Sequence, residues 1–337
     1  MARWLLHRAQ RDFDLMISDP VLISEWHPVA RAADVPDGAV TAARLLGEDV
    51  VLWRSGGKVM GWQDLCLHRG AKLSLGRVVA GDCLQCPYHG WIYDAAGKCV
   101  KIPAHPSQVP PARAKTKAYA VREAYGWIWL SFGEKPAALP DFPEWGRAGI
   151  RNFSYGPVRV AAAGPRIIEN FLDVSHLPIV HAGILGVASH AEIGRYTVTR
   201  SAGGVRAEDI EIFQPDPDGS GTDGTALYTY EVRHPLTAYL TKKAGKARFT
   251  MMITAAPVDE ASSFAWILFS LEDTASSDAE AMEWMHRVFI QDVPIVESQR
   301  PEKLPLDLQA ELHLNSDRTS IAYRQWLGEI GLAFGTA

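Results

Sequence analysis

The chain has 337 residues, a length that favours two domains over a single small core. Its 34 Lys and Arg against 39 Asp and Glu give a formal net charge of −5, which argues against nucleic acid as a partner because phosphate backbones attract basic proteins. With 47% hydrophobic and 22% charged residues, the composition excludes a largely disordered or fibrous protein.

Membrane insertion and export are not expected. The longest apolar runs, such as residues 265–271, have the length of a strand and fall far short of the roughly 20 residues that a membrane helix needs. Near the start of the chain, His7, Arg8, Arg11 and Asp12 interrupt any apolar core of a signal peptide. We therefore expect a cytoplasmic protein.

Short strands are predicted for the first part of the chain, from about residue 25 to residue 132. Runs rich in Val, Trp, Tyr and Leu alternate with turns containing Gly or Asp, a pattern typical of an antiparallel sandwich or barrel. The predicted strands are residues 41–45, 50–54, 59–63, 91–93 and 127–131.

The stretch 133–147 contains three prolines, which cannot sustain a helix or a central strand. We place the domain boundary there. The predicted domains are residues 1–140, including an N-terminal extension, and residues 141–337.

The second domain is predicted to combine a sheet with helices. Residues 165–177 have helical character, residues 278–299 form a helix capped by Ser277 or Asp278 with Pro294 inside it, and residues 317–332 form a last helix. Alternating runs predict strands at residues 196–200, 205–213, 227–233, 249–255 and 264–271. Residues 216–224 and 234–246 are candidate lids over a substrate pocket in this sheet.

Two Cys-plus-His pairs carry the first chemical signal. Cys66-Leu67-His68 is followed by Cys86-Pro87-Tyr88-His89, which gives two thiolates and two imidazoles on segments that can face each other. Such ligands suit zinc or a two-iron cluster, and the Cys-x-His spacing favours the cluster because it does not form the usual zinc knuckle. A zinc site that uses Cys83 and Cys86 stays open as an alternative; otherwise Cys83 and Cys99 are expected to be ordinary buried thiols.

The two motifs closely resemble the Rieske [2Fe-2S] signature. The resemblance implies that Cys66 and Cys86 hold one iron and that His68 and His89 hold the other. This domain would then store and pass on one electron at a time.

A second group of ligand-type residues begins at Glu169. Asp173, His176 and His181 follow within a helix-like segment, where Asp173 and His176 are spaced to share one helical face and Pro178 disturbs the turn between the histidines. Two imidazoles and one carboxylate on one face of a metal suit a non-haem Fe(II) that binds O₂. The third ligand is left open by the residues themselves; the candidates are Glu283, His286, Asp292 and Glu297, and the nearby Pro294 mildly favours Asp292.

This second group, followed by Asp292-Val-Pro-Ile-Val-Glu-Ser-Gln, resembles the iron motif of the Rieske non-haem iron oxygenases. The resemblance implies His176, His181 and Asp292 as iron ligands and an α+β fold, in which an all-β Rieske domain precedes a helix-grip catalytic domain with an antiparallel sheet. It further implies a head-to-tail homotrimer in which Asp173 bridges the iron of one subunit to the cluster of its neighbour. Asn170 would lie near the iron and orient substrate or O₂.

The resemblance also implies a terminal oxygenase of the α-only type. The segments 46–53, 104–106 and 298–301 are similar to those of purine-alkaloid N-demethylases and guanidinium-toxin hydroxylases. We expect a monooxygenase, rather than a dioxygenase, that hydroxylates or oxidatively demethylates a small organic substrate. No dinucleotide fingerprint is found in the sequence, so NAD(P)H is expected to act through a separate reductase or ferredoxin. The alternative from a different class is a non-catalytic Rieske electron carrier or ligand-binding protein.

Overall fold

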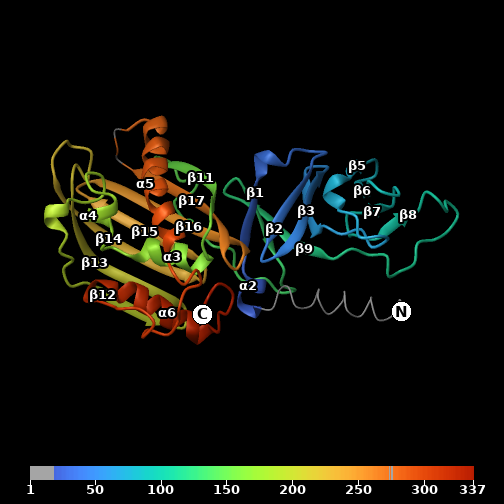
Figure 1. The fold of residues 1–337 in the computed structure, drawn as a ribbon. Helices are drawn as coiled ribbons and strands as arrows, with labels where there is room; N and C mark the ends of the chain where they lie inside the picture. The colour runs from blue at the N-terminus through green and yellow to red at the C-terminus, as the bar shows by residue number, and fades with distance from the viewer. Residues whose placement is uncertain (1–18, 273, 275) are drawn as a thin grey trace. The chain divides into compact units, whose positions relative to one another are not determined.

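The structure is a computed structural model that describes residues 19–272, 274 and 276–337. The chain divides into two compact units after Leu139 (Figure 1). The segment that the sequence analysis considered for an export signal lies outside the described residues. None of the helices in the described part of the chain combines the length and apolar character required to cross a bilayer.

The first unit contains two antiparallel sheets. The six-stranded sheet has the order β1 (His27–Arg31), β10 (Trp127–Ser131), β9 (Ala118–Ala124), β4 (Lys58–Gln63), β3 (Glu48–Ser55) and β2 (Val40–Leu45). The four-stranded sheet has the order β5 (Arg77–Val79), β6 (Cys83–Gln85), β7 (Ile92–Asp94) and β8 (Cys99–Lys101). A short helix, α2 (Pro20–Ser24), precedes β1. The five strands predicted in this region are confirmed as β2, β3, β4, β7 and β10.

Aromatic side chains form the core beside the cysteine motifs. The rings of Trp53 and Trp62 meet edge to face at 4.9 Å between centroids, and Trp62 in turn meets Tyr93 at 6.5 Å. Cys66 and Cys86 belong to the same buried cluster. The two thiols are therefore shielded from water by large apolar groups.

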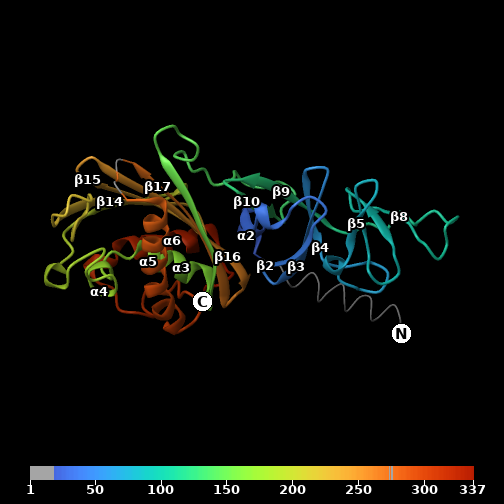
Figure 2. The ribbon, with the colours of Figure 1, turned by 90° about the horizontal axis from the view of Figure 1, so that it is seen from above.

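The second unit is built on a seven-stranded antiparallel sheet. Its order is β11 (Arg151–Val160), β17 (Ser262–Glu272), β16 (Ala247–Asp259), β15 (Thr237–Ala244), β14 (Gly224–His234), β13 (Gly204–Gln214) and β12 (Thr197–Ser201). The helices α3 (Gly164–Leu172), α5 (Asp278–Ser298) and α6 (Arg318–Ile330) lie on the same side of this sheet (Figure 2). The prediction of an α+β fold with an antiparallel sheet in the second domain is confirmed.

Local signals define the long helices. Ser277 caps α5 in a capping box with Glu280, each side chain bonding to the other residue's backbone amide, and Pro294 lies inside this helix. The helix α6 ends at Gly331, whose φ of 77° lies in the left-handed region that favours glycine. Both helices were predicted within two residues of these bounds.

Two predictions in the second unit are wrong. Residues 234–246 do not form a lid: most of them form β15, a central strand paired with β14 and β16. The helix predicted over residues 165–177 ends at Leu172 because Asp173 leaves the helical conformation, with a ψ of 122°, and its carboxylate accepts hydrogen bonds from the amide and hydroxyl of Ser175. Asp173 and His176 therefore do not share a helical face.

Candidate functional site

Two turns of similar geometry present the Cys and His motifs. The carbonyl of Cys66 accepts a hydrogen bond from the amide of Gly70, and the carbonyl of Cys86 accepts one from the amide of Gly90. Both glycines have a φ close to +70°. This backbone conformation is unfavourable for a residue that has a side chain, but it does not strain glycine. Each turn thereby holds one thiol and one imidazole within a few residues.

The thiols and the imidazoles of these turns occupy different environments. Cys66 and Cys86 are each 2% exposed, whereas His68 is half-buried and His89 is exposed. The two histidine rings lie 4.5 Å apart between centroids, and Trp91 stacks on His68 at 4.7 Å. The turns thus present two imidazoles toward the surface above two buried sulfurs.

The donor set of the turns fits a two-iron cluster better than a single zinc ion. A tetrahedral zinc draws its four donor atoms to within about 4 Å of one another. Within the described residues, no three of Cys66, His68, Cys86 and His89 bring donor atoms within 4.8 Å of one another. His68 also keeps a buried Nδ1 atom with no hydrogen-bond partner, as a ligand atom would.

Tyr93, Cys83 and Cys99 lie on the four-stranded sheet of the first unit. The hydroxyl of Tyr93 lies 3.3 Å from Sγ of Cys66, close enough to donate a hydrogen bond to that sulfur. Cys83 and Cys99 are buried, and their thiols donate to the carbonyls of Gly81 and Lys101. Burial raises the pKa of both thiols, so they are held as neutral groups.

A second group of ligand-type side chains meets in the other unit. His176 and His181 flank the short helix α4 (Leu177–Val180), and Asp292 comes from α5. Nε2 of His181 lies 3.2 Å and Nε2 of His176 lies 3.5 Å from Oδ1 of Asp292. One donor atom from each residue lies within 4.8 Å of the other two.

These three side chains fit a metal ion. Oδ1 of Asp292 is buried and makes no hydrogen bond, although two imidazole nitrogens lie within 3.5 Å of it. Neighbouring ligands of a six-coordinate ion are about 3 Å apart when each bond is about 2.1 Å long. The observed separations are close to that value, so the group has the composition and spacing of a two-histidine, one-carboxylate iron site.

Gln291 fixes the orientation of His181. Nδ1 of His181 lies 2.8 Å from Oε1 of Gln291, so Nδ1 carries the proton and Nε2 is left free toward Asp292. Burial lowers the pKa of His181, but the carboxylate of Asp292 and the bond to Gln291 outweigh it and raise the pKa above its ordinary value. The sequence analysis missed Gln291, although it directly precedes Asp292.

The other candidates for the third ligand lie elsewhere. Nδ1 of His286 bonds the hydroxyl of Tyr155 at 2.8 Å, and Glu297 accepts a hydrogen bond from the amide of Ala161. Glu283 lines a separate outer hollow. Of the four candidates, Asp292 is the one that joins His176 and His181.

Asp173 and Asn170 occupy different positions around this group. Oδ2 of Asp173 lies 3.6 Å from Nδ1 of His176, and the carboxyl is one-third exposed. Burial raises the pKa of Asp173, but the nearby imidazole of His176 and the hydrogen bonds from Ser175 lower it below its ordinary value. Asn170 lines the cavity in front of the three ligand-type residues, whereas Asp173 does not.

The cavity beside the three residues has mainly apolar walls. Helices α3 and α5 and strands β14 to β17 contribute to it. Besides His176, His181, Asp292 and Asn170, it is lined by Ile167, Phe171, Leu177, Leu185, Tyr228, Tyr230, Leu240, Lys242, Phe249, Met251, Ile253, Ile267, Trp284, Met285, Val288 and Phe289. Such walls exclude water and suit a small, largely apolar molecule.

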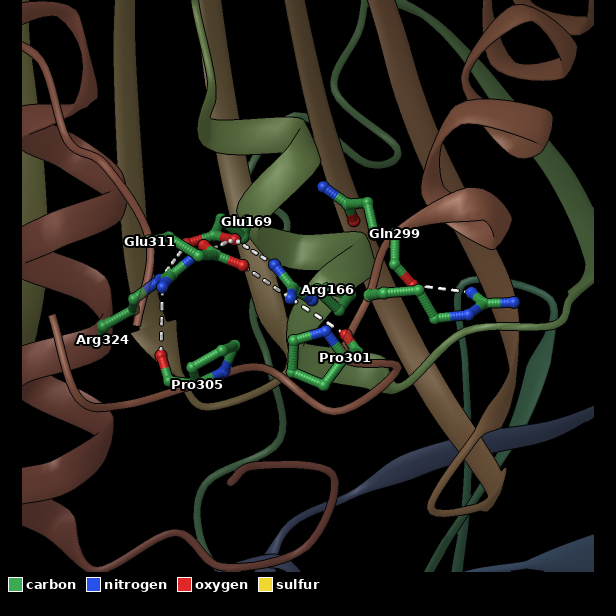
Figure 3. A network of polar contacts seen from close by, with 8 residues as sticks. Arg166, Glu169, Gln299, Pro301, Pro305, Glu311 and Arg324 are labelled. Atoms are coloured by element: carbon green, nitrogen blue, oxygen red, sulfur yellow. Dashed lines mark hydrogen bonds and ion pairs between the residues drawn. The ribbon is translucent and has the colours of Figure 1, made fainter. Parts of the chain in front are cut away.

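A buried ionic network anchors the helix that leads to this group. Figure 3 shows Arg166 and Glu169 of α3 together with Glu311 and with Arg324 of α6. Nη2 of Arg324 lies 2.9 Å from Glu169, and Nη2 of Arg166 lies 2.9 Å from Glu311. Pro301 and Pro305 accept further hydrogen bonds through their carbonyls. Because every charge has a partner, the network fixes α3 against α6 without leaving a buried charge unpaired.

Comparison with known proteins agrees with this geometry. Residues 25–120 match the Rieske [2Fe-2S] domain, and residues 160–333 match the vanillate O-demethylase oxygenase C-terminal domain. The chain belongs to the Rieske oxygenase family. The prediction of this family from the two sequence motifs is confirmed, and with it the prediction of an oxygenase enzyme that uses iron and an iron–sulfur cluster.

Its relatives include demethylases from Pseudomonas putida. The chain is 31% identical to methylxanthine N1-demethylase NdmA over 90% of this chain and 88% of NdmA, and 32% identical to methylxanthine N3-demethylase NdmB over 91% and 89%. The solved structure of NdmA with caffeine has a TM-score of 0.81 and 30% identity, covering 92% of this chain and 91% of that one. Oxidoreductase NdmD of the same organism is 40% identical over 34% of this chain and 20% of its own length. These similarities do not support the alternative hypothesis of a non-catalytic Rieske electron carrier or ligand-binding protein.

Proposed function

We propose that this Rieske oxygenase inserts an oxygen atom from O₂ into a C–H bond of a small organic substrate, with oxidative removal of an N-methyl or O-methyl group as the leading reaction. The observation that carries the proposal is the meeting of His176, His181 and Asp292 on the wall of an apolar cavity. The names of NdmA and NdmB, both N-demethylases, support demethylation over other oxygenations.

Iron is the group that we assign to these three residues, and Cys66, His68, Cys86 and His89 are the residues that would hold the [2Fe-2S] cluster. A non-haem iron with two histidines and one carboxylate keeps positions open at which O₂ reacts beside the substrate. Gln291 holds the proton on Nδ1 of His181 and so keeps Nε2 available as a ligand atom.

Asp173 acts as a positioning residue in this proposal. Its carboxylate accepts two hydrogen bonds from Ser175 and faces Nδ1 of His176 at 3.6 Å, so it stabilises the tautomer of His176 whose Nε2 points toward Asp292. Asn170 offers an amide to a polar group of the substrate or to O₂ inside the cavity. The apolar walls exclude water from the reacting methyl group.

Electrons come from a separate protein in this proposal. NAD(P)H delivers them through a reductase or ferredoxin, since the sequence has no dinucleotide fingerprint. We also propose a homotrimer in which the exposed part of Asp173 faces a cluster histidine of the partner subunit; the exposure of His89 and the one-third exposure of Asp173 support this arrangement.

Metal analysis tests the proposal. The purified protein should contain about three irons and two acid-labile sulfides per chain, with the absorption spectrum of a Rieske cluster. The variant Asp292→Ala should lose about one iron, keep the cluster spectrum, and lose demethylation of N-methyl and O-methyl probes, measured as formaldehyde release with a surrogate reductase. Glu283→Ala is the matched control because this carboxylate of α5 does not join the histidines, and it should keep all the iron. Two irons in both wild type and Asp292→Ala would contradict the proposal.

A further inference from the structure

The side chain of Lys242 lies where two cavities adjoin. The inner cavity contains His176, His181 and Asp292, and an outer hollow is lined by residues of α5, β16 and the loop after β13. Lys242, Phe249 and Trp284 line both. These three side chains therefore lie between the cavity of the ligand-type residues and the outer hollow.

The pairing of strands explains why Lys242 faces the cavity. Along β15, Leu240 and Lys242 both line the inner cavity, as expected for residues two apart on one face of a sheet. Lys242 is paired with Tyr228 of β14 on one side and with Phe249 of β16 on the other, and both of these line the cavity too. Lys243 alternates to the opposite face and is exposed.

Lys242 has no close partner of its own. Within the described residues, no hydrogen bond or ion pair involves its ammonium group, although the side chain is half-buried. Burial lowers the pKa of Lys242 to about 8, which the charges of Asp216 and Asp218 offset only in part. Removing an ammonium group from water is costly when no counter-ion is in direct contact with it, so an anion in the cavity would be stabilised there.

Asp216 and Asp218 are not direct counter-ions of Lys242 in the structure. Asp216 accepts a hydrogen bond from the amide of Gly221, and Asp218 accepts one from the amide of Ser220, so both carboxylates bond within their own loop. They line the outer hollow and not the inner cavity. The outer hollow also contains charges of both signs, from Arg248, Glu280, Glu283 and Arg287.

Among the described residues that line the cavity, Lys242 is the one cationic side chain apart from the histidines of the ligand group. Gln214 donates a hydrogen bond to the hydroxyl of Tyr228, and most of the remaining wall is aliphatic or aromatic. We infer that Lys242 forms an oxyanion-binding subsite, so that the preferred substrates are small aryl compounds with a carboxylate or similar oxyanion at the end toward the outer hollow. This inference rests on the proposed function, because that proposal makes the inner cavity the substrate site.

Matched acid and amide probes test the subsite. We would measure dissociation constants by isothermal titration calorimetry for benzoate, 4-methoxybenzoate and 2-naphthoate, each against its neutral amide, on the iron-loaded full-length protein. The wild type should bind at least one acid about tenfold more tightly than its amide, a ratio in the range expected for one charge-assisted hydrogen bond. Lys242→Met should lose this preference and keep its affinity for the amide. Lys243→Met removes the same charge from the opposite face and should behave as the wild type.

The outcomes separate this inference from the proposed function. Equal binding of acids and amides by the wild type, no binding of any acid, or an acid preference that survives in Lys242→Met would overturn the subsite. A protein with the expected iron content and demethylase activity but without acid preference would refute the subsite alone. An acid preference that depends on Lys242 in a protein lacking the third iron would refute the proposed function and leave the subsite intact.

Discussion

The two turns that carry the Cys-plus-His pairs, residues 66–70 and 86–90 and called the cluster turns below, differ from the group of His176, His181 and Asp292 in how the fold supports them. Each cluster turn brings one thiol and one imidazole together within five residues and is closed by a hydrogen bond from a glycine amide. The group of His176, His181 and Asp292 joins residues more than 110 positions apart, on α5 and around α4. The first depends on local backbone conformation, and the second depends on how helices pack on a sheet.

This difference predicts which mutations disturb which centre. A substitution far from His176 can displace it if the substitution loosens α3 or α5, whereas the cluster turns belong to another compact unit. Three predictions test this separation.

Removing Arg324 should have the largest effect. In Arg324→Met, the buried Glu169 loses two hydrogen bonds and the partly buried Glu311 loses one, so both carboxylates are left with too few partners. We expect the free energy of unfolding of the second unit to fall by about 3 kcal/mol, measured by denaturant titration, together with loss of the non-cluster iron. The Rieske absorption spectrum should persist.

A more exposed ion pair between β12 and α6 provides the control. Arg200 pairs with Glu329 near the surface, so Arg200→Met should lower the free energy of unfolding by less than about 1 kcal/mol.

A pH titration adds a second measurement: burial raises the pKa of Glu311, but Arg166 and Arg324 lower it below its ordinary value. The ion pairs of Glu311 therefore stabilise the fold at pH values above the pKa that Glu311 has in the unfolded chain. This stabilisation is lost as the pH falls through the lowered pKa of the folded state. In Arg324→Met, the free energy of unfolding should depend less on pH in this acid range. Equal stabilities of the two Met variants would count against the network.

An intermediate effect is expected for Gln291. In Gln291→Leu, Nδ1 of His181 loses its acceptor, so the imidazole is free to adopt the wrong tautomer or orientation. The affinity for the non-cluster iron should fall roughly 10- to 100-fold, measured by competition with a chelator. Gln291→Glu retains an acceptor and should recover most of the affinity; a similar loss in both variants would show that the hydrogen bond is not responsible.

The smallest effect is expected for Tyr93. A hydrogen bond to a cluster sulfur stabilises the reduced, more negative state, so Tyr93→Phe should lower the reduction potential while the iron content stays unchanged. Protein-film voltammetry measures this shift. Tyr119→Phe, which removes a buried hydroxyl without a hydrogen-bond partner in the described chain, should leave the potential where it is. If both variants shift equally, the contact between Tyr93 and Cys66 has no special role.

Errors of the sequence analysis occur where tertiary structure overrides a local pattern. The helix predicted over residues 165–177 fits the apolar spacing, yet Asp173 ends it because its carboxylate bonds to Ser175. The segment 234–246 contains three lysines and reads as a polar lid, yet it is the central strand β15. Pairing with β14 and β16 on both sides compensates for its weak strand character.

The sequence alone determined the two cluster turns, the family and the ligand-type histidines, because these depend on residues close together in the chain or on motifs with few alternatives. Residue spacing by itself left Asp292 among four candidates on one helix, and it was the family resemblance that singled Asp292 out. Nothing in the sequence indicated Gln291, the partners of Glu169 or the direction of Lys242. Those choices required the packing of α3, α5 and α6 on the sheet. Which face of a helix or strand meets a distant residue is set by long-range contacts, and local spacing does not encode it.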